Sequence, residues 1–296
     1  MNPSIKDPKH VFIIGCGDIG RRVAKIWLDK GIQVTGFSRS ERTLEKMQQA
    51  DIEGVHYDLD DPKQQNLINI AIKDNLLYYF APPPGMGKLD TRMAGFLALL
   101  ETVSPLPERI VLISTSGVYG DHQGGWVNEQ TPPKPMVERA YRRLDAEQQL
   151  TLFAQNHDIH LVILRVAGIY AADRLPIARI ENKVPILHES LAPQTNRIHA
   201  DDLATICVTA AQRGRAGAVY NVSDGSNSNM TDYFNQIAKH LGLPRPPTID
   251  WPEAERVLSK GMLSYLKESR RMDNRLMLEE LGVTLRYPDL AKGLKA

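Results

Sequence analysis

Residues 10–39, HVFIIGCGDIGRRVAKIWLDKGIQVTGFSR, decide the fold. The stretch opens with an apolar run at 11–14, which predicts a strand that is buried on both faces. Gly15, Gly17 and Gly20 follow with the spacing GxGxxG, and apolar residues at helical intervals come next. A second apolar stretch then predicts a second strand. This order of strand, glycine turn, helix and strand is the context in which GxGxxG binds a dinucleotide.

Each glycine has its own task in that arrangement. The first allows the tight turn, the second lets a diphosphate approach the backbone, and the third lets the helix pack closely on the strand. The N–H groups at the helix start, at Asp18, Ile19 and Gly20, would hold the diphosphate together with the helix dipole. The alternative is a glycine-rich turn with a purely structural task, but the complete context favours cofactor binding.

The end of the second strand, expected at 33–37, bears on which dinucleotide binds. A cofactor with a free ribose 2′-hydroxyl is usually held by an Asp or Glu at that point. Here Ser38 and Arg39 follow the strand, and the first carboxylate comes later. Arg39 and Arg42 would instead bind a 2′-phosphate, and Ser38 would add a hydroxyl donor. We therefore expect NADP(H) in preference to NAD(H); the alternative is that both arginines lie on a solvated loop.

Strand-like and helix-like stretches continue to alternate along the chain, with short links between them. This alternation predicts an α/β fold with a parallel, doubly wound sheet. Ligands bind at the carboxyl ends of the strands in such sheets, so Ala81 and Pro82, which follow a strand expected at 76–80, are candidate cofactor contacts. Asp58 either accepts a hydrogen bond from the adenine amino group or caps the following helix, and the sequence leaves both open.

The composition makes several classes of protein improbable. The 296 residues carry a net charge of +1, which gives no general electrostatic reason to bind nucleic acid or an anionic membrane. Arg165 interrupts the most apolar segment, 161–172, and the polar N-terminus is unlike a signal peptide. The two cysteines, Cys16 and Cys207, form no CxxC motif, and no cluster of side chains has metal-ligand spacing. We expect a cytoplasmic protein that holds no metal and acts on a small molecule.

Three later motifs carry a family resemblance. They are ISTSGVYG at 113–120, LR followed by IY within 164–170, and RIHADDLA at 197–204. In this order they resemble the short-chain dehydrogenase/reductase superfamily, and more narrowly its extended branch, the NAD(P)-dependent epimerase/dehydratase family.

The resemblance implies a division of the chain. Residues 1–170 would form a dinucleotide-binding Rossmann domain, to which 198–223 return. Residues 171–197 and 224–296 would form a smaller lobe that binds the substrate over the carboxyl ends of the strands.

The family's chemistry, as the resemblance implies it, uses a Ser or Thr, a Tyr and a Lys. Thr115 falls at the position of the hydroxyl that binds the reacting oxygen, with Ser116 beside it as a substrate contact. The alternative for Thr115 is a hydroxyl that caps its own strand end. Arg197, which opens the third motif, is the best candidate to contact an anionic group of the substrate.

The Tyr and the Lys are missing from their expected places. The family pattern is YxxxKxxxE, and Glu147 matches its last residue, which puts Arg143 at the lysine and Arg139 at the tyrosine position. Tyr141 starts another register, but Asp145 lies four residues on. Arg143 can bind ribose hydroxyls as a cation, whereas a guanidinium cannot act as a general acid or base near neutral pH. Equally, both arginines could form the exposed face of a helix. The chain thus resembles atypical members of the superfamily that lack the dyad.

Two functions remain open. The first is an NADP-dependent oxidoreductase or epimerase that acts on a sugar-like or small carbonyl or hydroxyl substrate. Thr115 would polarise the oxygen, and Tyr119, Tyr141, water or the substrate would supply the proton. The second is a regulatory protein that senses NADP(H) without turnover. The retained cleft motifs favour the enzyme, and the resemblance also implies a homodimer through long helices expected at 88–103 and 136–157.

Three smaller expectations concern structure alone. His199 is expected to be buried and hydrogen-bonded. Asp201 and Asp202 are expected to cap a helix at 203–212. The mixed run KESRR at 267–271 reads as solvated surface.

Overall fold

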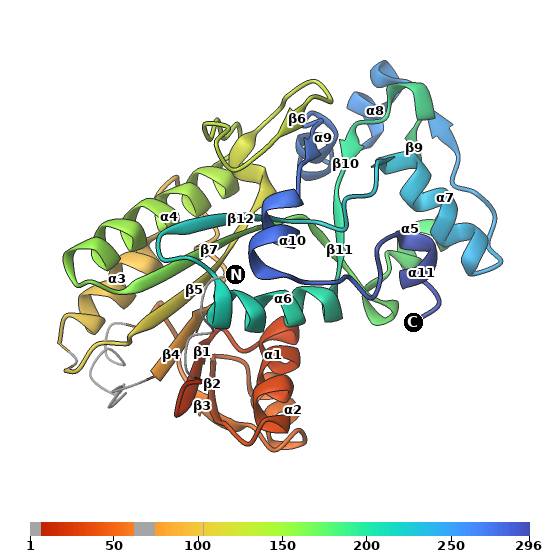
Figure 1. Ribbon diagram of the computed structural model, residues 1–296. Coiled ribbons are helices and arrows are strands. Elements are labelled where there is room, and N and C mark those ends of the chain that lie inside the picture. Colours follow the sequence, from red (N-terminus) through yellow and green to blue (C-terminus); the bar gives the residue numbers. More distant parts are fainter. Residues whose placement is uncertain (1–6, 62–74, 103) are drawn as a thin grey trace.

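A parallel sheet forms the centre of the molecule, and the computed structural model describes residues 7–61, 75–102 and 104–296. Seven strands lie in the order β12-β7-β5-β4-β1-β2-β3, and each neighbouring pair is parallel (Figure 1). The order turns outward in both directions from β1 and β4, so the predicted doubly wound α/β fold is confirmed. The strands are β1 (His10–Ile14), β2 (Gln33–Ser38), β3 (Glu53–His56), β4 (Asn75–Tyr79), β5 (Arg109–Thr115), β7 (His160–Val166) and β12 (Ala218–Val222).

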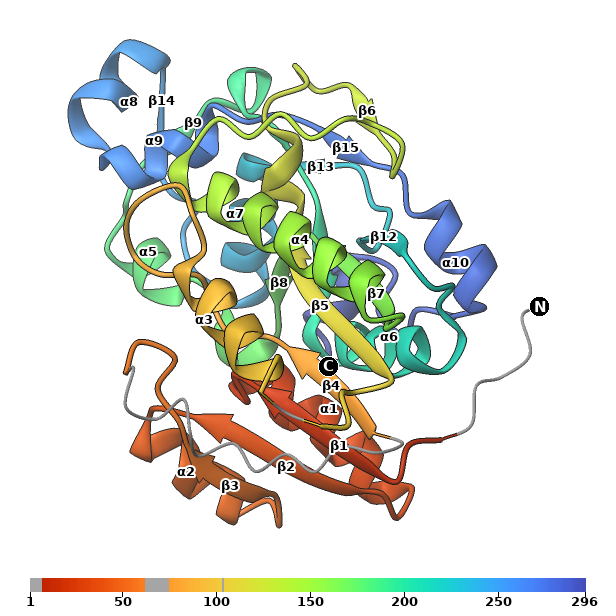
Figure 2. The same ribbon diagram turned by 90° about the vertical axis from the view of Figure 1, so that its left-hand side faces the viewer.

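The apolar run of β1 explains why helices cover both faces of the sheet. Val11 and Ile13 belong to one buried cluster, and Phe12 and Ile14 to another, because successive side chains of a strand point to opposite faces. Helices α3 and α4 cover the face of Phe12, and Figure 2 shows them in front of the sheet. Helices α1, α6 and α10 pack on the other face. The bounds are α1 (Asp18–Asp29), α3 (Thr91–Leu100), α4 (Glu138–Asn156), α6 (Ala200–Arg213) and α10 (Arg275–Leu281), with α2 (Glu41–Gln48) beside β2 and β3.

Two helix starts differ from the sequence-based expectation. The helix expected from residue 88 begins as α3 at Thr91, because the Asp90 carboxylate accepts a hydrogen bond from the Met93 N–H group at 3.0 Å. Helix α6 begins at Ala200, where the His199 ring nitrogen Nδ1 accepts from the Asp201 N–H group.

The expected cap of α6 was therefore wrong. Buried Asp202 instead accepts hydrogen bonds from the N–H groups of Arg286 and Tyr287, at 2.9 and 2.8 Å. Its carboxylate fastens the C-terminal segment to α6. His199 is buried and hydrogen-bonded, as expected.

The remaining elements gather beyond the carboxyl ends of the strands, around α7 and β9 in Figure 1. One small core there includes Ile180, Phe234 and Ile237, and a second includes Leu187 and Ile249. Within 224–296, α10 contacts α6 and β12, so the division into two lobes stays a prediction. The described part of the chain has no helix of the length and apolarity that crossing a membrane requires. These outer elements are β6 (Trp126–Val127), β8 (Gly168–Tyr170), α5 (Ile177–Glu181), β9 (Ile186–Leu187), β10 (Gln194–Thr195), β11 (Arg197–His199), β13 (Ser228–Asn229), α7 (Met230–His240), β14 (Thr248–Ile249), α8 (Trp251–Val257), α9 (Lys260–Leu266), β15 (Arg271–Met272) and α11 (Leu290–Gly293).

Candidate functional site

The glycine turn after β1 has the geometry that its sequence predicts. Gly15 has φ +83°, and a Cβ atom there would lie 2.5 Å from the Ala81 nitrogen, so only glycine fits. A Cβ atom at Gly17 would meet nothing nearer than the Gly15 carbonyl oxygen at 4.0 Å. The turn therefore packs tightly against the end of β4 and leaves space in front of Gly17. This is the space in which the sequence predicts a diphosphate.

Helix α1 starts at this space. Gly17 occupies its N-cap position, so the N–H groups of the first turn have no side-chain cap and remain available to an anion. Ile19 is buried, and a Cβ atom at Gly20 would come within 3.2 Å of the Cys16 and Ile13 side chains. Burial also raises the pKa of the Cys16 thiol to about 12, so Cys16 fills space as an unreactive thiol.

Asp18, in the first turn of α1 where the diphosphate is expected, carries a charge of the same sign as a diphosphate. Its carboxylate is neutralised by Arg22 (Nε at 3.2 Å) and by Arg174 (Nη1 at 2.9 Å). Arg22 also pairs with Asp201 at the start of α6. This cluster of ion pairs offsets the charge of Asp18 and ties α1 to the segment after β8.

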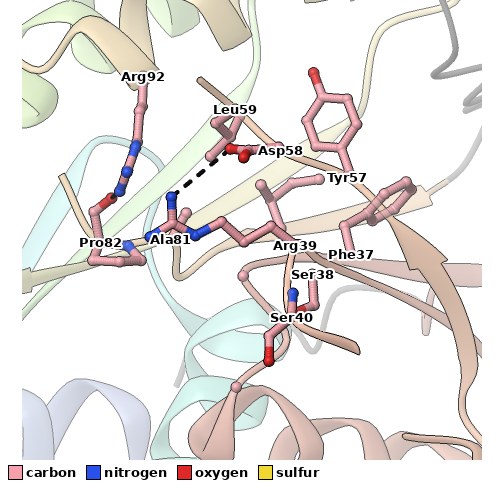
Figure 3. Close-up of a pocket in the computed structure, with 13 residues that line it drawn as sticks. Phe37, Ser38, Arg39, Ser40, Tyr57, Asp58, Leu59, Ala81, Pro82 and Arg92 are labelled. Carbon is pink, nitrogen blue, oxygen red and sulfur yellow. Dashed lines mark hydrogen bonds and ion pairs between the residues drawn. The ribbon is translucent and has the colours of Figure 1, made fainter. Parts of the chain in front are cut away.

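A pocket of about 230 Å³ opens beside the turn, at the carboxyl ends of β1 to β4 (Figure 3). The end of β2 supplies Ser38 and Arg39, the segment after β3 supplies Asp58, and the segment after β4 supplies Ala81 and Pro82. The structure thus brings most of the predicted cofactor residues to one place. The lining residues are Ile14, Gly15, Gly17, Phe37, Ser38, Arg39, Ser40, Tyr57, Asp58, Leu59, Ala81, Pro82 and Arg92.

Arg92, on α3, lines this pocket and was missed from the sequence, because no motif marks it. Its guanidinium holds the Asp60 carboxylate through Nε at 2.7 Å and donates to the Pro82 carbonyl oxygen at 2.9 Å. These hydrogen bonds lower the pKa of Asp60. Arg39 Nη1 also reaches Asp60, at 3.2 Å, and lies 3.9 Å from Asp58. Arg42, on α2, is outside the set of described residues that line the pocket.

Asp58 was expected either to contact the adenine or to cap a helix, and the described residues bear only on the first alternative. Its Oδ1 accepts from the Asp60 N–H group at 3.0 Å within the turn, and the residue lines the pocket. The helix that it was expected to cap would begin in 62–74, outside the described residues.

A second cavity, of about 450 Å³, lies between the sheet and the outer elements and contains the predicted substrate and catalytic positions except Tyr141. Thr115, Ser116, Arg143 and Arg197 all line this cavity, which we call the cleft. Thr115 Oγ1 accepts from the Gly117 N–H group at 3.2 Å, so the hydroxyl caps its own turn. An accepting hydroxyl still has its proton to donate. The two readings of Thr115 are therefore compatible.

Arg143 and Glu147 lie four residues apart on the buried side of α4 and have different partners. Arg143 is buried, and its Nη1 and Nη2 each donate to the Ala81 carbonyl oxygen at 3.2 Å. Glu147 accepts from Arg165 Nη2 at 2.8 Å and from the Ser114 hydroxyl. Burial lowers the pKa of the Arg143 guanidinium, which stays charged at neutral pH. Arg143 is thus a fixed cation beside Thr115.

Neither candidate tyrosine lies in the cleft. Tyr141 is 37% exposed, its ring lies 4.9 Å from Lys88 Nζ, and the described residues that line the cleft do not include it. Tyr119 is fully buried, and its hydroxyl donates to Asn221 Oδ1 at 2.8 Å. Burial also raises the pKa of Tyr119. The charged side chains that line the cleft with Thr115 are mainly arginines.

The run at 267–271 is not solvated throughout, which corrects the expectation. Glu268 and Arg270 are buried, pair at 3.0 Å and line the cleft, and Arg270 Nη1 donates to the Gly120 carbonyl oxygen at 2.6 Å. From the sequence alone, a run of mixed charges indicates residues exposed to solvent. Contacts with distant segments hold this run in place: the Ser269 carbonyl oxygen accepts from the His122 N–H group at 3.0 Å, and β15 pairs with β6 directly after the run.

Buried Asp224, near Arg197, gives a prediction of pH dependence. Burial raises its pKa to about 6 from the ordinary 3.8, although Ser226 donates two hydrogen bonds to Oδ1. Between these values the folded chain binds more protons than the unfolded chain, so the free energy of unfolding falls as pH rises. We expect a loss of up to about 3 kcal/mol between about pH 4 and about pH 7. Asp224→Asn should remove that part of the slope in urea denaturation, and an unchanged slope would contradict the assignment.

Taken together, the fold and the site define a class of protein. The chain belongs to the NAD dependent epimerase/dehydratase family, whose model matches residues 11–223. Protein YeeZ of Escherichia coli (strain K12) is 24% identical over 298 residues, which cover 95% of this chain and 97% of that protein. A functionally unknown conserved protein from Silicibacter pomeroyi superposes with a TM-score of 0.83 and 28% identity, over 97% of both chains. UDP-glucose 4-epimerase from Thermotoga maritima, solved with UDP-glucose, superposes with a TM-score of 0.78 at 17% identity, over 97% of this chain and 96% of that one. This last likeness is one of fold.

Proposed function

We propose that this protein binds NADP(H) and catalyses an oxidoreductase or epimerase reaction on a sugar-like or small carbonyl or hydroxyl substrate. The observation that supports this most directly is the shared edge of the sheet. Gly15 follows β1, Ala81 follows β4 and Thr115 ends β5, and these three strands are neighbours. With strands about 4.8 Å apart, a hydroxyl two strands from the glycine turn lies about 10 Å away. A dinucleotide held at the turn is long enough to bring its nicotinamide to that edge.

The chain's own residues have separate tasks in such a reaction. The nicotinamide, when bound, supplies hydride transfer. Thr115 would donate a hydrogen bond to the reacting oxygen, and the Arg143 charge would stabilise negative charge that develops there. Positioned proton transfer contributes about 10²–10⁴-fold to the rate. An arginine cannot supply it, so the proton comes from water or from the substrate.

The preference for NADP(H) depends on Arg39. An exposed ion pair such as Arg39–Asp60 contributes about 0–1 kcal/mol, whereas hydrogen bonds to a charged group contribute about 1.5–3 kcal/mol. Arg39 would therefore gain interaction free energy by leaving Asp60 for a 2′-phosphate, while Arg92 stays bound to Asp60. We expect Arg39→Gln to weaken NADPH binding about tenfold and NADH binding less than about twofold in calorimetric titrations. Equal losses in Arg39→Gln and Arg42→Gln would contradict this assignment.

Turnover is tested with Thr115. Purified protein is screened for NADPH oxidation against a panel of sugars and small carbonyl compounds, and the best substrate is retested with Thr115→Ala. We expect kcat to fall at least about tenfold with little change in NADPH affinity, because the lost hydrogen bond is made to the reacting oxygen. Unchanged kcat would remove Thr115 from the mechanism. Tight NADPH binding without any turnover would instead favour a regulatory protein that senses the cofactor.

A further inference from the structure

Three arginines line the cleft without an acidic partner among the described residues. Arg139 and Arg143 reach it from α4, and Arg197 reaches it from β11. In the described part of the chain, no carboxylate lies within 4.0 Å of any of these three guanidinium groups. Glu268 is the acidic residue that lines the cleft, and Arg270 already holds it at 3.0 Å.

The hydrogen bonds of the first two arginines go to neutral groups. Among the described residues, the Ala81 carbonyl oxygen is the acceptor for Arg143. Arg139 donates to the Ser264 hydroxyl at 2.8 Å, and its guanidinium stacks 3.9 Å from the Tyr265 ring. Neutral acceptors orient a guanidinium without balancing its charge.

Arg197 is held in the same manner. It donates to the Asn196 carbonyl oxygen at 3.2 Å and stacks 4.1 Å from the Tyr233 ring. Its buried Nε atom has no hydrogen-bond partner in the part of the chain that the structure describes. Burial lowers the pKa of both Arg143 and Arg197. Asp90 partly offsets this effect on Arg143, and Asp224 does so on Arg197, but among the described residues neither carboxylate pairs with these guanidinium groups. A buried charge without a contacting counter-ion is unfavourable, so an arrangement that keeps two of them on one cavity implies an anion that arrives with the ligand.

The position of that anion follows from the spacing of two of the arginines on α4. Arg139 and Arg143 are four residues apart and share one face of α4, next to Thr115. We propose that the substrate carries a carboxylate or phosphate group at its reacting end, bound by Arg139 and Arg143 in place of the missing tyrosine and lysine. That this end of the substrate is the one that reacts rests on the proposed function, whereas the anion site itself does not. Both groups match the fork of a guanidinium, and Arg197 provides a further cation for a second acidic group.

The test uses the whole protein and simple anions. Malonate, inorganic phosphate and glucose are titrated calorimetrically with and without saturating NADPH. We expect malonate or phosphate to bind and glucose not to bind. The anion that binds more tightly indicates whether the substrate carries a carboxylate or a phosphate. Arg139→Gln and Arg143→Met should weaken that binding at least about tenfold. Arg256→Gln, which removes an exposed arginine on α8 paired with Glu253, should leave it unchanged. Arg139 is only partly buried, so its variant keeps the test valid if Arg143→Met does not fold.

Two results would overturn the proposal. One is binding of glucose as tight as that of both anions, and the other is equal anion affinity in Arg139→Gln and Arg256→Gln. Failure of the proposed function is distinguishable, because it appears as absent NADPH binding or as absent turnover. Anion binding that is sensitive to Arg139 would persist in that case.

Discussion

Glu147→Ala is expected to lower the free energy of unfolding by about 3–5 kcal/mol, because it leaves the Arg165 charge buried without a partner. Glu147 is 4% exposed and Arg165 5%, and the carboxylate receives two donors of Arg165 and the Ser114 hydroxyl. The Tyr119 ring, 4.9 Å from the guanidinium, cannot replace a carboxylate. Urea denaturation of the variant and the wild-type protein measures the loss.

A matched change on the same helix separates burial from charge. Glu138 is 62% exposed and lies 3.8 Å from Arg142, so Glu138→Ala should cost no more than about 0.5 kcal/mol. The double variant Glu147→Met with Arg165→Met should recover most of the stability, because apolar side chains of similar volume can replace a buried pair. Equal losses for Glu138→Ala and Glu147→Ala would show that the buried network contributes nothing special.

This network also shows what a helical pattern can and cannot predict. Residues four apart share a face of a helix, and residues two apart lie about 200° from one another. That geometry puts Arg143 and Glu147 on one face and Tyr141 on another, but it left open which face is exposed. The structure buries Arg143 and Glu147 and leaves Tyr141 exposed. The pattern could not say that Glu147 pairs with Arg165, because that contact joins α4 to β7 and depends on how the helix packs on the sheet.

The same distinction runs through the fold and the site. The sheet and the glycine turn were predictable, because the apolar run of β1 and the spacing of Gly15, Gly17 and Gly20 are local signals. The place of Arg92 in the pocket and the burial of Glu268 were not, because each depends on contacts between distant segments. The cap of α6 was also mispredicted. There the two aspartates that suit a cap were used for tertiary contacts, and His199 took the position.

Gly17→Val is expected to weaken NADPH binding at least about 100-fold, or about 3 kcal/mol, with little change in thermal stability. The Cβ position at Gly17 is open, so the folded chain tolerates a side chain there. That open space is where a diphosphate would approach the backbone, and a branched side chain would fill it. Calorimetric titration with NADPH and the midpoint of thermal unfolding give the two readouts.

Two other glycines provide the comparison. Gly261→Val, on exposed α9 with its nearest neighbouring atom at 4.0 Å, should affect neither NADPH affinity nor the midpoint. Gly15→Ala should instead lower the midpoint, because φ is +83° and the new Cβ would meet the Ala81 backbone at 2.5 Å. If the turn binds the diphosphate, Gly17→Val should lose NADPH affinity but keep its midpoint of thermal unfolding, whereas Gly15→Ala should lower that midpoint. NADPH affinity that survives Gly17→Val would mean that the cofactor, if it binds, does so away from the first turn of α1.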